Sequence, residues 1–401
     1  MIRKIHPKHS INHQIKRLYQ SSSIGEIHSG FQSKSIRPHQ SKSSTRLIAE
    51  TAFYKLLTVP TIQTIIPPMA NLIAKKQPPI LTPIMDTICS AMFIGGKNLK
   101  EATPLINKLN KLGVKTIIDL ANEGSQTNIN QTFHELISLI QNSGDNRAIS
   151  GIAVKVSGLA KAKVLQNWNK PGIAHEKEEL SHKMIALAKQ AKNYNLKLYI
   201  DAEQYPIQGA INDISRSLMM KFNAGTEPII YTTHQTYLKE SNELLKQDIE
   251  WAKQLNITFG TKIVRGAYLH DTLALNPQSP LVFETKSETD RSFNEAMKLC
   301  INHNVHTLIA THNSESLSLL DQLSKQQSKN NVQSAQLLGM RDDLTFSKEK
   351  SAKYIPIGNL DDGARLFLTR RLIENSDPFS GANDEVATRI DELKHRVSIN
   401  Q

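Results

Sequence analysis

Short apolar runs alternate with longer amphipathic segments from about residue 100 onward in this 401-residue chain. Each run is four to seven residues long and rich in Ile, Val, Leu or Tyr, which is typical of buried parallel strands. The pattern predicts eight strands, at Val114–Leu120, Ile152–Val156, Lys197–Ile200, Pro228–Thr232, Thr261–Val264, His306–Ala310, Val332–Leu337 and Lys353–Ile357.

Between these runs, apolar residues recur with the i, i+3, i+4 spacing of helices, as in Phe133, Leu136, Ile137 and Ile140. Strands that alternate with helices indicate a parallel sheet. Eight repeats over about 270 residues fit an α/β fold of the closed (β/α)₈ type, which typically takes about 250 residues. An open, doubly wound sheet is the alternative. The seventh helix, within residues 341–351, is the weakest element because it is short and polar.

Residues 50–110 contain prolines but no motif that we can assign, and we expect an arm that wraps the barrel. No stretch reaches the roughly 18 uninterrupted apolar residues of a membrane-spanning helix. The nearest, Leu56–Ala74, is interrupted by Pro60, Pro67 and Pro68. It predicts a packed arm or a surface-seeking segment, which leaves peripheral membrane contact open.

The net charge of +12 is unevenly distributed. Residues 1–49 hold nine basic residues and one acid, Glu26, so this segment supplies +8 and the rest of the chain +4. The segment is also rich in Ser, which is typical of a mitochondrial presequence, with a disordered basic tail as the alternative. An RNA-binding arm ranks last, because only Tyr19 and Phe31 are present for base stacking. Two cysteines, Cys89 and Cys300, are too few for a disulfide framework.

In a barrel of this kind, catalytic groups belong at the C-terminal ends of the strands. Polar side chains recur at all eight predicted strand ends. Any one of them could be polar simply because the chain reaches solvent there, but this explains the full set of eight less well. They are Asp119 with Glu123, Lys155, Asp201 with Glu203 and Gln204, Gln235, Lys262 with Arg265, Thr311 with His312 and Asn313, Gln336, and Tyr354. Lys155 and Lys262 adjoin apolar residues, where a lysine is costly unless paired. We expect cations that point into the barrel mouth toward an anionic ligand, with snorkelling lysines as the alternative.

The last predicted barrel helix, Asp361–Asn375, carries Arg370, Arg371 and Glu374. An exposed ion pair would explain these residues alone. The helix follows the eighth strand, however, so two guanidinium groups near the mouth could hold a carboxylate. GxGxxG after a strand and the GxxxxGK[ST] loop are missing, which disfavours a Rossmann nucleotide site and a P-loop NTPase. HExxH and CxxC are missing too, so no metal site is expected, and there is no GxSxG nucleophile elbow. The chemistry then needs a cofactor held by the barrel, or acid–base work by carboxylates and lysines.

The strand-end segments together resemble the proline dehydrogenase family in its single-function mitochondrial form. They are IAVKVSGLA (152–160), LYIDAEQ (198–204), IIYTTHQTYLK (229–239), TKIVRGAYL (261–269), ATHNS (310–314), QLLGM (336–340), YIPIG (354–358) and FLTRRLIEN (367–375). The resemblance covers about residues 115–380. KxVRGAY followed by ATHN and RRxxEN is the specific part of it.

The resemblance implies a distorted (β/α)₈ TIM-type barrel at residues 111–380, with non-covalent FAD at the strand ends and a helix over the mouth. It adds an N-terminal arm at 50–110 and a C-terminal tail at 381–401. The implied activity is oxidation of L-proline to 1-pyrroline-5-carboxylate by hydride transfer to FAD. Electrons would pass to ubiquinone, with peripheral contact on the matrix side of the mitochondrial inner membrane and no nucleic-acid partner. A dehydrogenase of hydroxyproline or another cyclic imino acid is the alternative, and a catalytically inactive binding barrel is a third hypothesis.

The resemblance also implies roles for individual residues. The substrate side comprises Lys155, Asp201, Tyr268, Leu337, Tyr354, Arg370, Arg371 and Glu374. The flavin side comprises Gln235, Lys262, Arg265, Ala267, Thr311, His312 and Asn313. Glu123 matches a carboxylate that pairs with the helix arginines when substrate is absent. The chain departs from the family pattern at Thr232–His234, Ile357 and Phe367. It keeps Tyr354, which favours proline over hydroxyproline.

Overall fold

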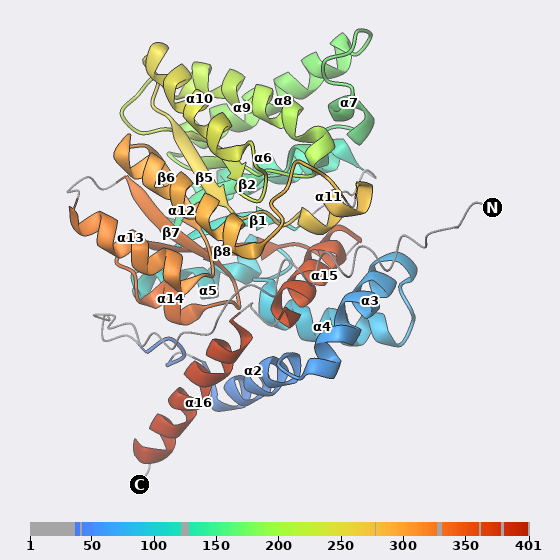
Figure 1. Cartoon of the computed structure of the whole chain (residues 1–401), viewed down its shortest axis with the longest axis vertical. Coiled ribbons are helices and arrows are strands. Elements are labelled where there is room, and N and C mark those ends of the chain that lie inside the picture. Colours follow the sequence, from blue (N-terminus) through green and yellow to red (C-terminus); the bar gives the residue numbers. More distant parts are fainter. Residues whose placement is uncertain are drawn as a thin grey trace.

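The computed structural model describes residues 37–40, 42–121, 128–276, 278–326, 331–360, 362–377 and 381–399. Eight parallel strands close into a barrel in chain order (Figure 1). Their bounds are β1 Lys115–Leu120, β2 Ile149–Val154, β3 Lys197–Ile200, β4 Ile230–Gln235, β5 Gly260–Val264, β6 His306–Ala310, β7 Val332–Leu337 and β8 Ser351–Ile357. The predicted (β/α)₈ barrel is confirmed and the open sheet is wrong, because β1 pairs with both β2 and β8.

Alternate residues of the strands point into the barrel or out toward the helices. In β1, Ile117 belongs to the inner cluster and Ile118 to the outer core. The inner cluster includes two tyrosines, Tyr199 and Tyr231, whose ring centroids lie 4.8 Å apart. Gly151 makes room for Tyr199, since a Cβ there would lie 2.7 Å from the Tyr199 ring. The barrel interior is therefore a packed core, and the strand ends are left for chemistry.

Helices surround the barrel and connect successive strands (Figure 1). They are α6 Ile129–Ser143, α7 Ala162–Gln166, α8 Ala174–Asn193, α9 Tyr205–Phe222, α10 Ser241–Gln254, α11 Leu269–Leu275, α12 Lys286–Asn302, α13 Ser314–Gln326, α14 Asp342–Phe346 and α15 Asp362–Ser376, with one 3₁₀ turn, η1, at Val156–Gly158. The helix predicted as short, α14, has five residues. Helix α16, Ala382–Ile399, follows the barrel.

The segment before the barrel forms four helices, α2 Ser44–Leu57, α3 Pro60–Lys76, α4 Leu81–Phe93 and α5 Leu99–Lys111. Pro60 occupies the first turn of α3, where its missing N–H costs nothing. Helices α2, α3 and α4 form an arm beside the barrel, in which α3 and α4 contact α15 and α2 contacts α16 (Figure 1). Within the described residues, no single helix is long and apolar enough to span a membrane; α2 and Pro60–Ile73 of α3 reach that length and composition only as a pair bent by 93°.

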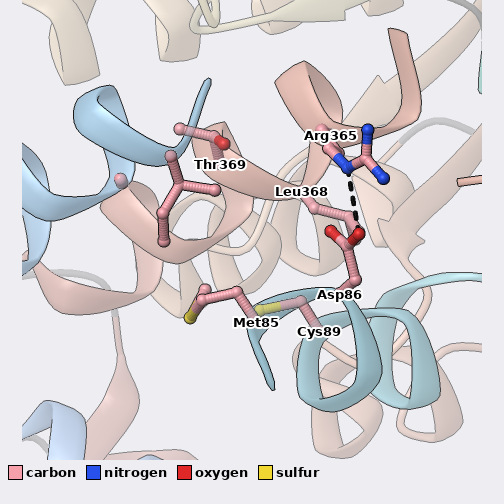
Figure 2. Close-up of a pocket in the computed structure, with 8 residues that line it drawn as sticks. Met85, Asp86, Cys89, Arg365, Leu368 and Thr369 are labelled. Carbon is pink, nitrogen blue, oxygen red and sulfur yellow. Dashed lines mark hydrogen bonds and ion pairs between the residues drawn. The ribbon is translucent and has the colours of Figure 1, made fainter. Parts of the chain in front are cut away.

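A narrow crevice marks the contact between the arm and α15. Its walls come from α3, α4 and α15, and Figure 2 shows Arg365 of α15 directed at Asp86 of α4. Arg365 Nε lies 2.9 Å from Asp86 Oδ2. Apolar groups surround this pair, including Leu368 and Cys89. The arm therefore supports α15 on the side away from the barrel.

Buried ion pairs connect the start of the described chain to its end. Arg389 of α16 is fully buried, donates to Glu385, and lies 3.2 Å from Glu50 Oε2 of α2. Its guanidinium carbon also lies 4.5 Å from the centroid of the Tyr54 ring. Arg37 pairs with a carboxylate of α16 at 3.1 Å. Residues 37–40 and 42–49, placed by composition in the basic segment, thus pack against the folded body.

His39 in this network makes folding stability depend on pH. Burial, with the nearby charges of Arg389 and Lys42, lowers the pKa of His39 to about 3 against the opposing effect of Asp342. Because the folded pKa lies below the unfolded value near 6.5, the contribution of neutral His39 is complete above about pH 6.5 and is lost as pH falls toward 3. We expect the free energy of unfolding to fall in this window by up to about 1.4 kcal/mol per pH unit from this residue.

Urea unfolding at several pH values between 4 and 7 tests this, with His39→Asn as the variant. The variant is expected to show a shallower dependence, by about one proton, because Asn has no charge to gain. If the free energy of unfolding depends on pH with the same slope in the wild type and in His39→Asn, the role given to His39 is contradicted. His182 on the surface of α8 is the matched control, and His182→Asn should leave the slope unchanged.

Candidate active site

Charged side chains of alternating sign meet at the C-terminal ends of the strands. Lys155, which follows β2, donates to Asp119 Oδ1 of β1 at 2.5 Å, and its Nζ lies 3.9 Å from Asp201 Oδ2. Lys262 of β5 donates to Asp201 Oδ1. The Tyr354 hydroxyl of β8 donates to Asp201 Oδ2 at 2.7 Å. Asp201, immediately after β3, is therefore the shared acceptor at the barrel mouth.

Burial and neighbouring charges set the protonation of this cluster. Burial alone would raise the pKa of Asp201, but Lys262 and Lys155 together lower it, so the carboxylate stays ionised. Burial lowers the pKa of Lys155, and Asp119 and Asp201 more than reverse this, so the ammonium is retained. Burial and the same two carboxylates raise the pKa of Tyr354 well above its usual range. The phenol is therefore neutral and acts as a hydrogen-bond donor.

A second group is formed by α15, the loop after β6 and the end of β7. Arg371 Nη1 lies 2.6 Å from Glu374 Oε2, and His312 Nδ1 lies 3.3 Å from Glu374 Oε1. The backbone N–H of Leu337 donates to His312 Nε2 at 3.1 Å, so the ring hydrogen of a neutral His312 sits on Nδ1 and points to Glu374. Burial disfavours ionised Glu374, but Arg371, His312 and Arg370 lower its pKa to about 2.

The two adjacent arginines of α15 are close enough to influence each other electrostatically. Burial first, and then the neighbouring Arg371, lower the pKa of Arg370 to about 9, while Asp119 and Glu374 act in the opposite sense. The Arg370 guanidinium carbon lies 5.3 Å from the centroid of the Tyr268 ring. Arg371 Nε is buried and has no hydrogen-bond partner among the described residues. An anionic ligand would satisfy this N–H.

The two groups face the same mouth of the barrel. Asp119 of the first group acts electrostatically on Arg370 of the second, and Asp201 and Glu203 act on Tyr268. Lys155, Asp201, Tyr268, Leu337, Tyr354, Arg370, Arg371 and Glu374, the predicted substrate-side residues, are all described there or on its rim. Glu123 lies outside the described residues, so its predicted pairing stays a prediction.

Several predicted flavin-side residues bond to one another. Arg265 donates through Nη1 to Thr311 Oγ1 at 2.6 Å and through Nη2 to Ser316 Oγ at 2.8 Å, and its Nε lies 2.5 Å from Asp290 Oδ1. Asn313 Oδ1 accepts from the Ser316 N–H at 2.8 Å and so caps the start of α13. Arg265 thus ties the end of β5 to the β6–α13 turn, and most of its donors are used within the protein.

The remaining flavin-side residues line other strand ends. Gln235 Nε2 donates to the carbonyl oxygen of Glu203 at 2.9 Å. Ala267 follows Gly266, whose φ of +115° suits glycine and whose missing Cβ makes room for the Tyr237 ring. Lys262 donates to Asp201 with one of its three N–H groups. A flavin ring offers carbonyl and ring-nitrogen acceptors, so the donor chemistry of Lys262 fits this cofactor.

Two supporting residues had no role assigned from the sequence. Glu203 accepts hydrogen bonds from the backbone N–H and the hydroxyl of Ser157, which fixes the loop after Lys155. Lys353, adjacent to Tyr354 in β8, donates to the carbonyl oxygens of Leu337 and Met340. The only sequence signal for Lys353 was a charged residue inside a buried strand. Among the described residues, no group of three or more His, Cys, Asp or Glu side chains is placed to hold a metal ion.

Comparison with known proteins adds a family and a shared fold. Residues 102–384 match the family model described as Proline dehydrogenase. The chain is 29% identical over 303 residues to the carbapenem antibiotics biosynthesis protein CarD of Pectobacterium carotovorum subsp. carotovorum, covering 72% of this chain and 80% of that protein. It is 28% identical over 357 residues to the mitochondrial proline dehydrogenase 1 of Dictyostelium discoideum, covering 73% of this chain and 62% of that protein.

Among solved structures, proline utilization A (PutA) of Bdellovibrio bacteriovorus, inactivated by N-propargylglycine, superposes with a TM-score of 0.67. The two share 18% sequence identity, and the match covers 95% of this chain and 42% of PutA. At this identity the likeness shows the common barrel fold.

Proposed function

Because the chain belongs to the proline dehydrogenase family, we propose that it oxidises L-proline to 1-pyrroline-5-carboxylate with non-covalently bound FAD. The observation that carries the proposal is Arg371, a buried arginine whose Nε has no hydrogen-bond partner among the described residues, beside a second arginine at the barrel mouth. A buried donor of this kind is costly unless a ligand accepts from it. The carboxylate of an amino acid is such a ligand.

The side chains at the mouth would divide the work of binding proline. Arg370, Arg371 and Lys155 would bind its carboxylate, and Tyr268, Leu337 and Tyr354 would pack on the pyrrolidine ring. Asp201 and Glu374 would hold these cations and the Tyr354 hydroxyl in place through the contacts described above. Fixing the carboxylate also favours the neutral amine, from whose neighbouring carbon a hydride leaves more readily.

The cofactor would lie over the same strand ends. Gln235, Lys262, Arg265, Ala267, Thr311, His312 and Asn313 would contact it. When bound, FAD supplies the hydride acceptor, and the protein supplies orientation and nearby charge. Lys262 would place positive charge beside the flavin ring while Asp201 fixes its ammonium group. This division of roles uses no catalytic nucleophile.

We further propose that the electrons pass to ubiquinone and that the protein acts at the matrix side of the mitochondrial inner membrane, without a nucleic-acid partner. The composition of the basic N-terminal segment supports import. Arg37 pairs with Glu392, and Lys42 and Arg46 pair with Glu50, so we place the end of an import signal before Arg37. The second oxidation of the product would then require another protein or domain.

The proposal is tested by the visible spectrum of the purified protein before and after anaerobic addition of L-proline. We expect the bands of oxidised flavin, followed by bleaching with proline. Bleaching with hydroxyproline alone would instead support the alternative substrate. A protein that binds no flavin, even after FAD is added, would contradict the proposal.

A further inference from the structure

The arm carries most of the exposed apolar side chains of the described structure. Nine of its sixteen exposed large hydrophobic residues fall between Ile48 and Ile88. Six of them lie on α3, on α4 or in the turn between these helices, and we call these six the arm face: Ile65, Leu72, Ile80, Leu81, Ile84 and Ile88. Exposed clusters of this kind mark surfaces that bind a partner or a membrane.

The arm face lies on the sides of the helices that turn away from α15. In α4, Asp86 and Cys89 face the crevice at α15 (Figure 2), whereas Leu81, Ile84 and Ile88 recur at i, i+3, i+7 on the other side. A surface helix of a globular protein normally presents charged or polar residues to solvent. Residues 60–74 contain no charged residue, and the one charged residue of α4, Asp86, pairs inward with Arg365 at 2.9 Å.

The charges around the arm face have a single sign. Residues 51–97 contain four cations, Lys55, Lys75, Lys76 and Lys97, and one carboxylate, Asp86. Asp86 is buried and paired with Arg365. Apolar side chains bordered by cations fit the interface of an anionic bilayer. A symmetric contact between two copies of this face would instead bring like charges together with no carboxylate between them.

We propose that the arm face binds the surface of an anionic lipid bilayer, with its isoleucines and leucines inserted at the boundary between headgroups and acyl chains. The arm seats α15, and α15 carries Arg370 and Arg371 to the barrel mouth. Membrane binding would therefore hold the mouth beside the bilayer. An apolar electron acceptor dissolved in the lipid could then reach the site, a consequence that rests on the proposed function, whereas the binding itself does not.

Flotation of the full chain with vesicles tests the binding. The probes are vesicles of phosphatidylcholine alone and of phosphatidylcholine with phosphatidylglycerol. The arm variant is Ile84→Glu with Ile88→Glu, at side chains that are 51% and 41% exposed. The control variant is Met220→Glu with Leu255→Glu, 51% and 48% exposed outside the arm. All of these proteins keep the basic N-terminal segment, so differences between them report on the arm face.

We expect the wild type and the control variant to float with the anionic vesicles, and the arm variant to bind roughly tenfold to a hundredfold more weakly. Equal binding by all three proteins would assign the contact to another segment and overturn the proposal. Failure of the wild type to float would overturn it as well. Self-association of the wild type that the arm variant alone abolishes, without vesicle binding, would show that the face is a subunit interface.

A labelling experiment avoids charged substitutions. Both native cysteines, Cys89 and Cys300, are buried, so an environment-sensitive fluorophore can be attached selectively to Ile84→Cys or to the control Met220→Cys. We expect a blue shift on anionic vesicles only for the label at position 84, and an unshifted spectrum there would contradict insertion. Proline oxidation is assayed separately with a soluble dye and no vesicles. Flotation without proline oxidation would refute the proposed function and support membrane binding by the arm face. Proline oxidation without flotation would support the proposed function and refute membrane binding.

Discussion

Replacing Arg371 by Met is expected to raise the KM for L-proline on the order of a hundredfold, with FAD still bound. The substitution keeps the length and apolar stem of the side chain but removes the guanidinium that lies 2.6 Å from Glu374 and whose Nε has no hydrogen-bond partner among the described residues. A desolvated, charge-assisted hydrogen bond to a ligand contributes about 2–5 kcal/mol when one partner is truncated. Because the lost contact exists in the substrate complex, the main effect is on KM. Arg370→Met should act in the same direction.

Arg365→Met is the matched control on the same helix. Arg365 also pairs with a carboxylate, at 2.9 Å, but its partner is Asp86 in the arm. We expect its KM to stay within about twofold of the wild type, since its ion pair with Asp86 lies in the crevice at the arm. Steady-state kinetics with a dye acceptor give the KM of each variant, and the flavin absorbance of each protein shows whether FAD is still bound. Equal KM values for wild type and Arg371→Met would refute the carboxylate assignment.

The barrel could be predicted because most of its strands are apolar. The strand β4 shows why a strand with polar residues is harder to predict. The sequence placed the fourth strand at Pro228–Thr232, whereas β4 runs through Ile230–Gln235. Its later residues are polar yet buried, because each finds a partner inside the protein. Thr233 donates to the carbonyl oxygen of Ile200, and His234 Nε2 lies 3.1 Å from Asp248 Oδ2. Hydrophobic patterning cannot detect polar groups that are satisfied by distant residues.

The residues at the mouth were predictable, but their pairings were not. Position near a strand end places Asp201 and Lys262 at one end of the barrel, and the pairing of β4 with both β3 and β5 brings the two side chains together. The contact of His312 with Glu374 joins residues 62 apart in sequence. Arg389 and Glu50 are 339 residues apart, so their buried pair left no local signal. Pairings of this kind depend on topology.

The helices of the arm could not be predicted from the sequence, because the prolines suggested that any helix there would be interrupted. Pro67 and Pro68 lie inside α3, where each removes a backbone donor at a cost. Buried contacts of Ile66, Ala70 and Ile73 with α4 and α15 stabilise the helix against that cost. Tertiary packing thus outweighs local propensity here. The same packing leaves the other side of α3 apolar and exposed.

Replacing Asp201 by Asn is expected to lower both stability and activity more than any other single change at the strand ends. Asp201 accepts from Lys262 and Tyr354 and lies 3.9 Å from Lys155. The amide keeps the shape but leaves two buried ammonium groups with less negative charge. Removing one partner of a buried ion pair costs about 3–5 kcal/mol, which thermal unfolding would measure. The matched control is Asp213→Asn on the exposed side of α9, expected within about 0.5 kcal/mol of the wild type.

The pH dependence of kcat/KM shows whether Asp201→Asn acts through stability alone or also through the charge of Lys155. Asp119 and Asp201 both raise the pKa of Lys155, so the loss of Asp201 lowers it. The protonated ammonium, needed to bind a carboxylate, is then lost at a lower pH in Asp201→Asn than in the wild type. We expect the alkaline limb of kcat/KM to move to lower pH, in addition to a fall of roughly a hundredfold in kcat/KM near neutrality. An unshifted limb in a folded, flavin-loaded variant would mean that Asp201 supports the barrel mouth without setting the charge of Lys155.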